Sequence, residues 1–72
     1  MKSLDVTGLS RPEPVIRTRS ALKELSPGEK IEVVVDTVTA RENVSRAALS
    51  MNCGISIEEI GNQFRLTLQK KI

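Results

Sequence analysis

The chain contains very few of the residues on which catalytic and metal sites usually depend. Among its 72 residues there is no histidine, and Cys53 is the single cysteine. One cysteine excludes an internal disulfide, and the two shortages together argue against a zinc or iron–sulfur site, so we expect no metal and no cofactor. The lack of histidine also removes the commonest general base, which argues against ordinary hydrolytic catalysis and leaves open whether the chain is an enzyme.

Aromatic residues and long hydrophobic runs are scarce as well. Phe64 is the only aromatic residue, whereas surfaces that stack single-stranded bases use several rings, so RNA is a weakly supported partner. No apolar run is long enough to span a membrane, and residues 1–4 lead into strand-like sequence without a signal peptide. We therefore expect no membrane association and a cytoplasmic location. The net charge of +2 permits an acidic partner without indicating nucleic acid.

What the chain does contain fits one small globular domain. Hydrophobic residues make up 39% and charged residues 28% of the sequence, proportions that are typical of folded domains and not of disordered segments. A chain of 72 residues leaves room for only one hydrophobic core. Residues 1–72 are therefore predicted to form a single domain, which we expect to be a monomer.

The hydrophobic patterns predict four strands and two helices. Alternation predicts a short strand over residues 4–7, a β-branched run predicts a buried strand over 31–35, and two alternating runs around Gly61-Asn62 predict a hairpin. Helical periodicity predicts helices over about 11–25 and 39–51. The order βαβαββ indicates an α+β fold, a two-layer α/β sandwich. Its mixed four-stranded sheet would carry both helices on one face, because each helix has one apolar stripe.

The spacing of polar residues predicts how the elements begin and end. Thr39 with Glu42 has the three-residue spacing of a capping box, which predicts that the second helix begins there. Asn52 is predicted to end that helix in the left-handed conformation, which asparagine tolerates better than most residues. The last three residues, 70–72, are predicted to be a frayed tail.

The start of the first helix has an unusual composition. Ser10 with Glu13 again has capping-box spacing, and Pro12 stands where a first helical turn tolerates a missing N–H. Arg11 is therefore predicted to be the first residue inside the helix. A helix N-terminus favours negative charge, so an arginine has the unfavourable sign at this position.

Three segments of the sequence resemble a known family. They are Leu-Asp-Val-Thr-Gly-Leu at 4–9, Pro-Glu-Pro-Val at 12–15 and Ala-Arg-Glu-Asn-Val at 40–44. With the βαβαββ order, they resemble the TusA/SirA-like family of small sulfur-carrier proteins. Within it the chain is most similar to the N-terminal domain of YedF-type proteins, which are associated with selenium metabolism. The hallmark of this family is Cys-Pro-x-Pro at the start of the first helix, and Arg11 stands where that cysteine belongs. The positions that carry the motif are Gly8, Ser10, Pro12, Glu13 and Pro14.

The resemblance implies a function and also a defect. Family members use the cysteine thiolate to accept persulfide sulfur and to pass it to a protein partner, such as a cysteine desulfurase or a downstream sulfur acceptor. A guanidinium is neither nucleophilic nor deprotonated near neutral pH. The resemblance therefore implies a sulfur- or selenium-trafficking domain that is inactive as a carrier with Arg11 in place. YedF-type proteins usually carry a second, DsrE-like domain, so whether residues 1–72 are part of a longer protein stays open.

Three interpretations of Arg11 are open at this point. It is an altered position, natural or engineered, in a protein whose close relatives carry cysteine or selenocysteine; or it marks a divergent member kept for binding; or it captures an anion. Cys53 follows the second helix, where nothing in the neighbouring sequence indicates an activated thiolate. It is interpreted as a small buried hydrophobic residue and not as a substitute sulfur acceptor.

The basic residues give a second hypothesis, a non-catalytic module that binds protein or RNA through a basic helix face. The candidate docking residues are Arg17, Arg19, Lys23 and Arg41, with Arg11 and Arg46 nearby. The simpler interpretation is a solvated face on which these cations pair with Glu13, Glu24 and Glu42. The family's fold is similar to that of the C-terminal domain of bacterial translation initiation factor three, but fold analogy is weak support for RNA binding.

Overall fold

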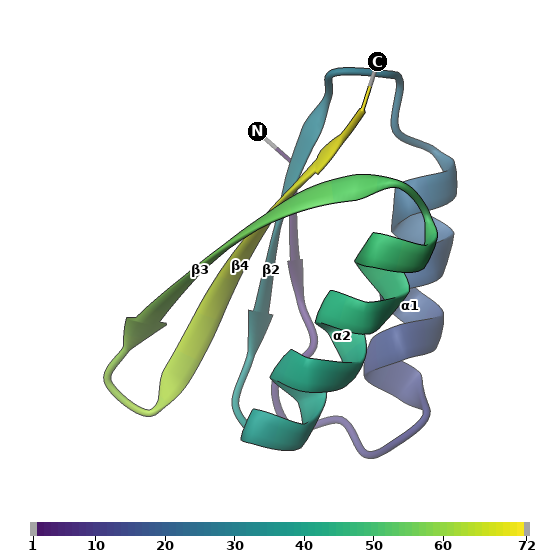
Figure 1. Ribbon diagram of the computed structural model, residues 1–72. Coiled ribbons are helices and arrows are strands. Elements are labelled where there is room, and N and C mark those ends of the chain that lie inside the picture. The colour runs from purple at the N-terminus through teal and green to yellow at the C-terminus, as the bar shows by residue number, and fades with distance from the viewer. Residues whose placement is uncertain (1, 72) are drawn as a thin grey trace.

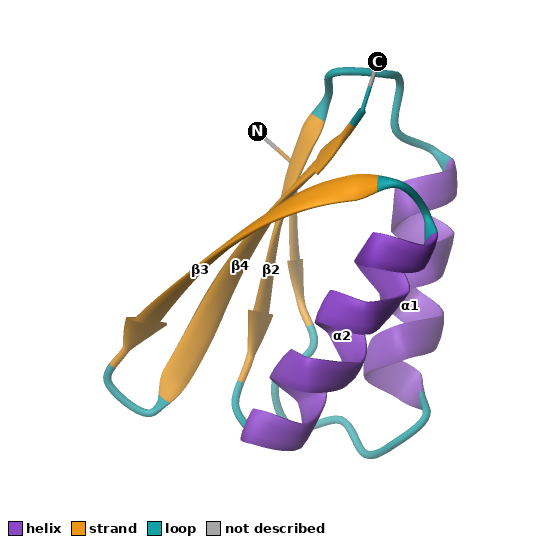
Figure 2. Cartoon of the chain, in the orientation of Figure 1, coloured by secondary structure: helices purple, strands orange, loops and turns teal. Residues whose placement is uncertain are grey.

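Two helices cover one face of a four-stranded sheet in the computed structural model, which describes residues 2–71 (Figure 1). Both helices lie on the same side of the strands (Figure 2), which confirms the predicted βαβαββ order and the two-layer α+β class. The elements, in chain order, are β1 (Lys2–Asp5), α1 (Glu13–Lys23), β2 (Lys30–Val35), α2 (Val38–Ser50), β3 (Cys53–Ile60) and β4 (Gln63–Lys70).

The sheet is open and mixed, with the strand order β1-β2-β4-β3. β1 and β2 run parallel, as a strand–helix–strand unit predicts, and Leu4 lies opposite Val33. β4 runs antiparallel to both of its neighbours, and β3 and β4 form the predicted hairpin. The carboxyl ends of β1 and β2 therefore meet at one edge of the molecule, where the loops that enter the two helices also lie.

The core lies between the sheet and the helices and is almost entirely aliphatic. Along β2, the residues Ile31, Val33 and Val35 are buried while the residues between them are only partly covered, which is the period of two expected for a strand. Leu22 of α1 and Val44 of α2 are fully buried against this face. Among residues 2–71, neither helix combines the length and apolar character needed to cross a lipid bilayer.

Both predicted capping boxes are wrong by about two residues. α1 begins at Glu13 with Pro12 as its N-cap, and no side chain caps it. The N–H of Glu13 instead donates to the Ser10 carbonyl at 3.0 Å, so Arg11 lies in a turn before the helix and not inside it. Because Pro14 has no N–H, this first turn has one donor fewer to satisfy, and the Ser10 side chain is not needed as a cap.

α2 begins at Val38, so its N-cap lies two residues before the predicted cap, Thr39. Its N-cap is Thr37, whose hydroxyl accepts a hydrogen bond from the Ala40 N–H at 3.0 Å. Thr39 therefore lies in the first helical turn. The Ala40 side chain is buried, so its backbone N–H needs an acceptor close by, and the extended residue before the helix provides it.

Two further expectations at the chain ends need correction. The first strand covers Lys2–Asp5 and not residues 4–7, because the Asp5 side chain bonds the backbone two residues on and ends the strand. Lys70 is not frayed, because its N–H donates to the Glu29 carbonyl at 3.0 Å. Ile72 lies outside the described residues. Asn52 has φ of 61°, which confirms the predicted left-handed residue after α2.

Candidate functional site

The loop that leads into α1 is tied to the carboxyl ends of both parallel strands. Asp5, the last residue of β1, accepts hydrogen bonds from the Thr7 N–H at 2.9 Å and from the Thr7 hydroxyl at 2.6 Å. These bonds, the hydroxyl one above all, lower the pKa of the Asp5 carboxyl below its ordinary value. Asp36, directly after β2, accepts from the Gly8 N–H at 2.9 Å. Two carboxylates thus fix the path of the chain just before Arg11.

The residues of the motif itself build a rigid turn. Gly8 has φ of +75°, a left-handed conformation that a side chain would strain. Pro12 and Pro14 fix their own φ angles on either side of the helix start, and Pro14 is buried while Pro12 is exposed. Arg11 is exposed between Ser10 and Pro12. The turn therefore presents whichever side chain stands at position 11 to solvent.

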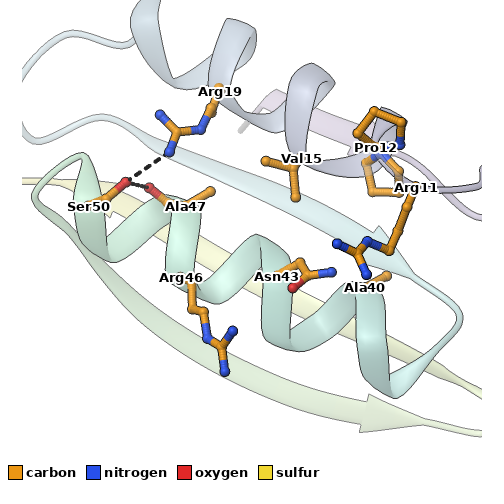
Figure 3. A pocket seen from close by; sticks show the side chains of 10 residues that line it. Arg11, Pro12, Val15, Arg19, Ala40, Asn43, Arg46, Ala47 and Ser50 are labelled. Carbon is orange, nitrogen blue, oxygen red and sulfur yellow. Dashed lines mark hydrogen bonds between the residues drawn. The ribbon is translucent and has the colours of Figure 1, made fainter.

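Position 11 opens onto a groove between α1 and α2. The groove has a volume of about 410 Å³, and Figure 3 shows that the Arg11 side chain extends from the turn toward α2, near Ala40 and Asn43. Val15 lies between the two helices, and the Arg19 guanidinium lies farther along and donates to the Ser50 hydroxyl at 3.4 Å. The residues that line the groove are Arg11, Pro12, Pro14, Val15, Arg19, Ala40, Asn43, Arg46, Ala47 and Ser50.

The candidate docking residues on α1 do not share one surface role. Arg19 lines the groove, whereas the Arg17 Nε lies 3.4 Å from a carboxylate oxygen of Glu13, four residues earlier on the same helix. This exposed ion pair is the arrangement that the simpler interpretation predicts. Lys23 lies in the last helical turn, where a cation interacts favourably with the helix dipole.

Arg41 on α2 is also engaged outside the groove. Its guanidinium carbon lies 4.9 Å from the centre of the Phe64 ring, a cation–π distance, and its Nη2 lies 3.3 Å from a carboxylate oxygen of Glu42. The structure therefore brings Arg11 and Arg19 to the same groove and leaves Arg17 and Arg41 in separate contacts. Of the four candidate docking residues, only Arg19 lines the groove.

The sequence reasoning missed the contribution of α2 to this site. Asn43 and Ser50 line the groove from the second helix, and neither was a candidate. Their signal is present in the sequence, because Ala40, Asn43, Ala47 and Ser50 recur at steps of three and four residues and so share a helix face. What could not be read is which helix that face meets. The role of Asp36 in holding the loop was also missed, because its hydrogen-bond partner, Gly8, lies 28 residues away in the sequence.

Cys53 has the environment of a structural residue. Only 1% of it is exposed, and it belongs to the hydrophobic core at the start of β3. Burial raises the pKa of the Cys53 thiol above its ordinary value, with a smaller opposing effect from Lys70. The interpretation of Cys53 as a small buried hydrophobic residue agrees with this placement. Among residues 2–71 no group of three or more acidic, cysteine or histidine side chains is arranged to hold a metal ion.

Comparison with known proteins connects this architecture to sulfur carriers. Three of the proteins that the chain resembles are named "Putative sulfur carrier protein". That of Methanocaldococcus jannaschii is 44% identical over 71 residues, which cover 97% of this chain and 95% of that protein. That of Thermotoga maritima is 34% identical over 61 residues, which cover 83% of this chain and 77% of that protein. That of Archaeoglobus fulgidus is 43% identical over 44 residues, which cover 61% of this chain and 57% of that protein.

The fold agrees with the sequence matches. The crystal structure of a SirA-like protein from Desulfitobacterium hafniense matches with a TM-score of 0.87 and 30% identity over 100% of both chains. The family model described as "Sulfurtransferase TusA" matches residues 2–70, nearly the whole chain. The resemblance noted in the sequence is therefore confirmed at the level of the family. The chain belongs to the TusA family of sulfurtransferases and shares the SirA-like fold.

Proposed function

We propose that the chain is a sulfur-relay domain that engages the protein partners of its family but cannot carry sulfur at position 11 as the sequence stands. The observation that supports this proposal best is the placement of Arg11. It is exposed on a turn that two prolines stiffen and that Asp5 and Asp36 hold to the sheet. Such a turn suits a reactive group, whereas a guanidinium has no nucleophilic atom near neutral pH.

No other residue replaces the missing acceptor in this proposal. Cys53 is the only cysteine, and a buried thiol with a raised pKa is a poor nucleophile because the thiolate is the reactive form. A cysteine at position 11 would instead be exposed, directly before the start of α1, and a helix N-terminus favours a thiolate.

The proposed partner is a cysteine desulfurase or a downstream sulfur acceptor. Sulfur passes between two proteins only when their sulfur atoms meet, so the presenting loop has to be exposed, as residues 10–13 are. Ile16 on the next turn of α1 is 49% exposed and provides apolar area beside that loop. A selenocysteine in place of Arg11 would carry out the analogous step with selenium, so selenium transfer belongs to the same proposal.

The test restores the acceptor in the variant Arg11→Cys, combined with Cys53→Ala to remove the other thiol. The purified variant is incubated with a cysteine desulfurase and cysteine. The thiolate at position 11 attacks the outer sulfur of the desulfurase persulfide, a new S–S bond forms, and the desulfurase cysteine leaves as a thiolate. We expect mass spectrometry to find one added sulfur atom on position 11 in most of the protein.

A second cysteine variant provides the control. Ser20→Cys with Cys53→Ala places an exposed thiol on α1, away from the loop and the groove, and we expect little sulfur on it. The chain with Arg11 intact is expected to remain unloaded. If the folded Arg11→Cys variant gains no more sulfur than the Ser20→Cys variant, the loop does not present a carrier position, and the proposed relay function is wrong.

A further inference from the structure

The groove between α1 and α2 combines an apolar floor with unpaired positive charge. Pro12, Val15 and Ala47 provide apolar surface, and none of the ten residues that line the groove is acidic. Within residues 2–71, Arg11, Arg19 and Arg46 have no carboxylate within ion-pair distance, whereas the other arginines of the chain do. Those paired arginines are Arg17, Arg41 and Arg65. In the described part of the chain, the arginines without a carboxylate partner are thus the three that line this groove.

The two arginines that reach into the groove lie at its opposite ends. In Figure 3 the Arg11 side chain extends toward Asn43 at one end, and Arg19 reaches Ser50 at the other, with Val15 between them. The Arg46 side chain extends away from α1 in the same view. The arrangement is therefore a cation, an apolar stretch and a second cation, in a groove whose volume of about 410 Å³ lies in the range of small-molecule sites.

We propose that this groove binds an elongated organic dianion, with a carboxylate or phosphate group at each end and an apolar chain between them. A guanidinium presents a planar fork of donors that matches the oxygens of either group. The apolar chain of such a ligand would cover Val15 and Ala47, while the Asn43 amide would complete the polar contacts at one end. The hydrogen bond from Arg19 to Ser50 is long, at 3.4 Å, and exposed, so exchanging it for a carboxylate costs little.

This inference goes beyond the proposed sulfur-relay function and does not depend on it. It uses the chain with Arg11 as written, whereas the relay test replaces that residue. If the Arg11→Cys variant accepts no sulfur, the unaltered chain is still expected to bind the dianion. If the variant does accept sulfur, that result gives no information on whether the unaltered chain binds the dianion. The two experiments can therefore fail independently.

The test is an NMR titration of the unaltered chain with straight-chain dicarboxylates of increasing length. We expect saturable shifts in the amide signals of Val15, Asn43 and Ala47, with an affinity that passes through a maximum at the chain length that spans the groove. The matching monocarboxylates engage only one arginine, so they are expected to bind at least about tenfold more weakly than the best dicarboxylate. Inorganic phosphate serves as the probe for a simple anion site. Equal affinity for phosphate, or no dependence on chain length, would overturn the proposal.

Arginine variants locate the binding energy. Arg11→Met and Arg19→Met keep an apolar stem but remove the fork, and each is expected to lower the affinity for the best dicarboxylate about tenfold. Arg17→Met is the matched control, because it removes the same charge from α1 at a residue paired with Glu13 outside the groove. We expect it to change the affinity less than about twofold. If Arg17→Met weakens binding as much as Arg19→Met, only net charge attracts the ligand and the site does not exist.

Discussion

Cys53 shows how strongly the surroundings of a single residue set its chemistry. It is 1% exposed, and burial raises the pKa of its thiol. Since the thiolate is the form that reacts, we predict that iodoacetamide modifies native Cys53 at least about a hundredfold more slowly than it modifies the unfolded chain at the same pH. Alkylation followed by mass spectrometry, with and without urea, measures this ratio.

An exposed thiol on the same strand provides the control for this prediction. Ser56 is exposed three residues along β3, so Cys53→Ala with Ser56→Cys is expected to react at nearly the unfolded rate in both conditions.

The raised pKa of Cys53 also sets the sign of its contribution to stability as the pH changes. The thiol stabilises the fold fully below the unfolded pKa, and this contribution is lost as pH rises through the higher folded value. Rapid alkylation of native Cys53 would contradict the buried placement and reopen its role as a sulfur acceptor.

At the scale of one element, the start of α2 depends on Thr37. Its hydroxyl accepts from the Ala40 N–H at 3.0 Å, and its carbonyl accepts from the Arg41 N–H at 3.0 Å. We predict that Thr37→Ala lowers the free energy of unfolding by about 1 kcal/mol, because it removes a side-chain cap and leaves a partly buried N–H without an acceptor. Urea denaturation followed by circular dichroism measures the change.

Thr39 is the matched control, because its spacing from Glu42 makes it the more obvious cap in the sequence. It lies inside the first turn of α2 and is exposed. Alanine has the higher helix propensity, so Thr39→Ala is expected to change the free energy of unfolding by less than about 0.5 kcal/mol. A larger loss from Thr39→Ala than from Thr37→Ala would show that the helix begins at the capping box after all.

These two threonines also show what the sequence could and could not predict about the elements. The apolar periodicity that includes Val44 identified α2, because burial of one face requires that period. The residue at which α2 begins depends on where β2 ends and on which N–H groups become buried, and both depend on tertiary packing. The predicted frayed tail at Lys70 was wrong for a similar reason, since its backbone partner, Glu29, lies in a loop far away in sequence.

At the scale of the whole molecule, the candidate site exists only through the packing of two helices. The start of α1 near Pro12 and Pro14 was predictable to within about two residues, because these prolines restrict the backbone locally, although Arg11 lies in the turn before the helix and not inside it. The groove was not, because it depends on α1 and α2 lying side by side on one face of the sheet (Figure 1). Asn43 is 32 residues from Arg11, and Ser50 is 31 residues from Arg19. Periodicity identifies the buried face of a helix but not the element that packs against it.

The same helix layer leaves part of the sheet uncovered, so residues on the helix-facing side of the sheet differ in how deeply they are buried. Leu66 on β4 and Ile57 on β3 are opposite each other in the sheet, so their side chains point to the same face. Leu66 is 0% exposed, whereas Ile57 is 47% exposed. β3 is an edge strand of the sheet, and its residues 56–60 are all exposed. We predict that Leu66→Ala lowers the free energy of unfolding by about 2–5 kcal/mol.

Ile57→Ala is the matched variant, with the same number of side-chain carbons removed on the same face. Because about half of Ile57 already contacts water, its loss is expected to cost only about 1 kcal/mol. Urea denaturation of both variants measures the difference, and light scattering measures the mass of the unaltered chain under the same conditions. Equal losses from the two variants would mean that something covers Ile57 in solution. If the measured mass were then that of a dimer, the covering surface would be a second copy, and the expected monomer would be wrong.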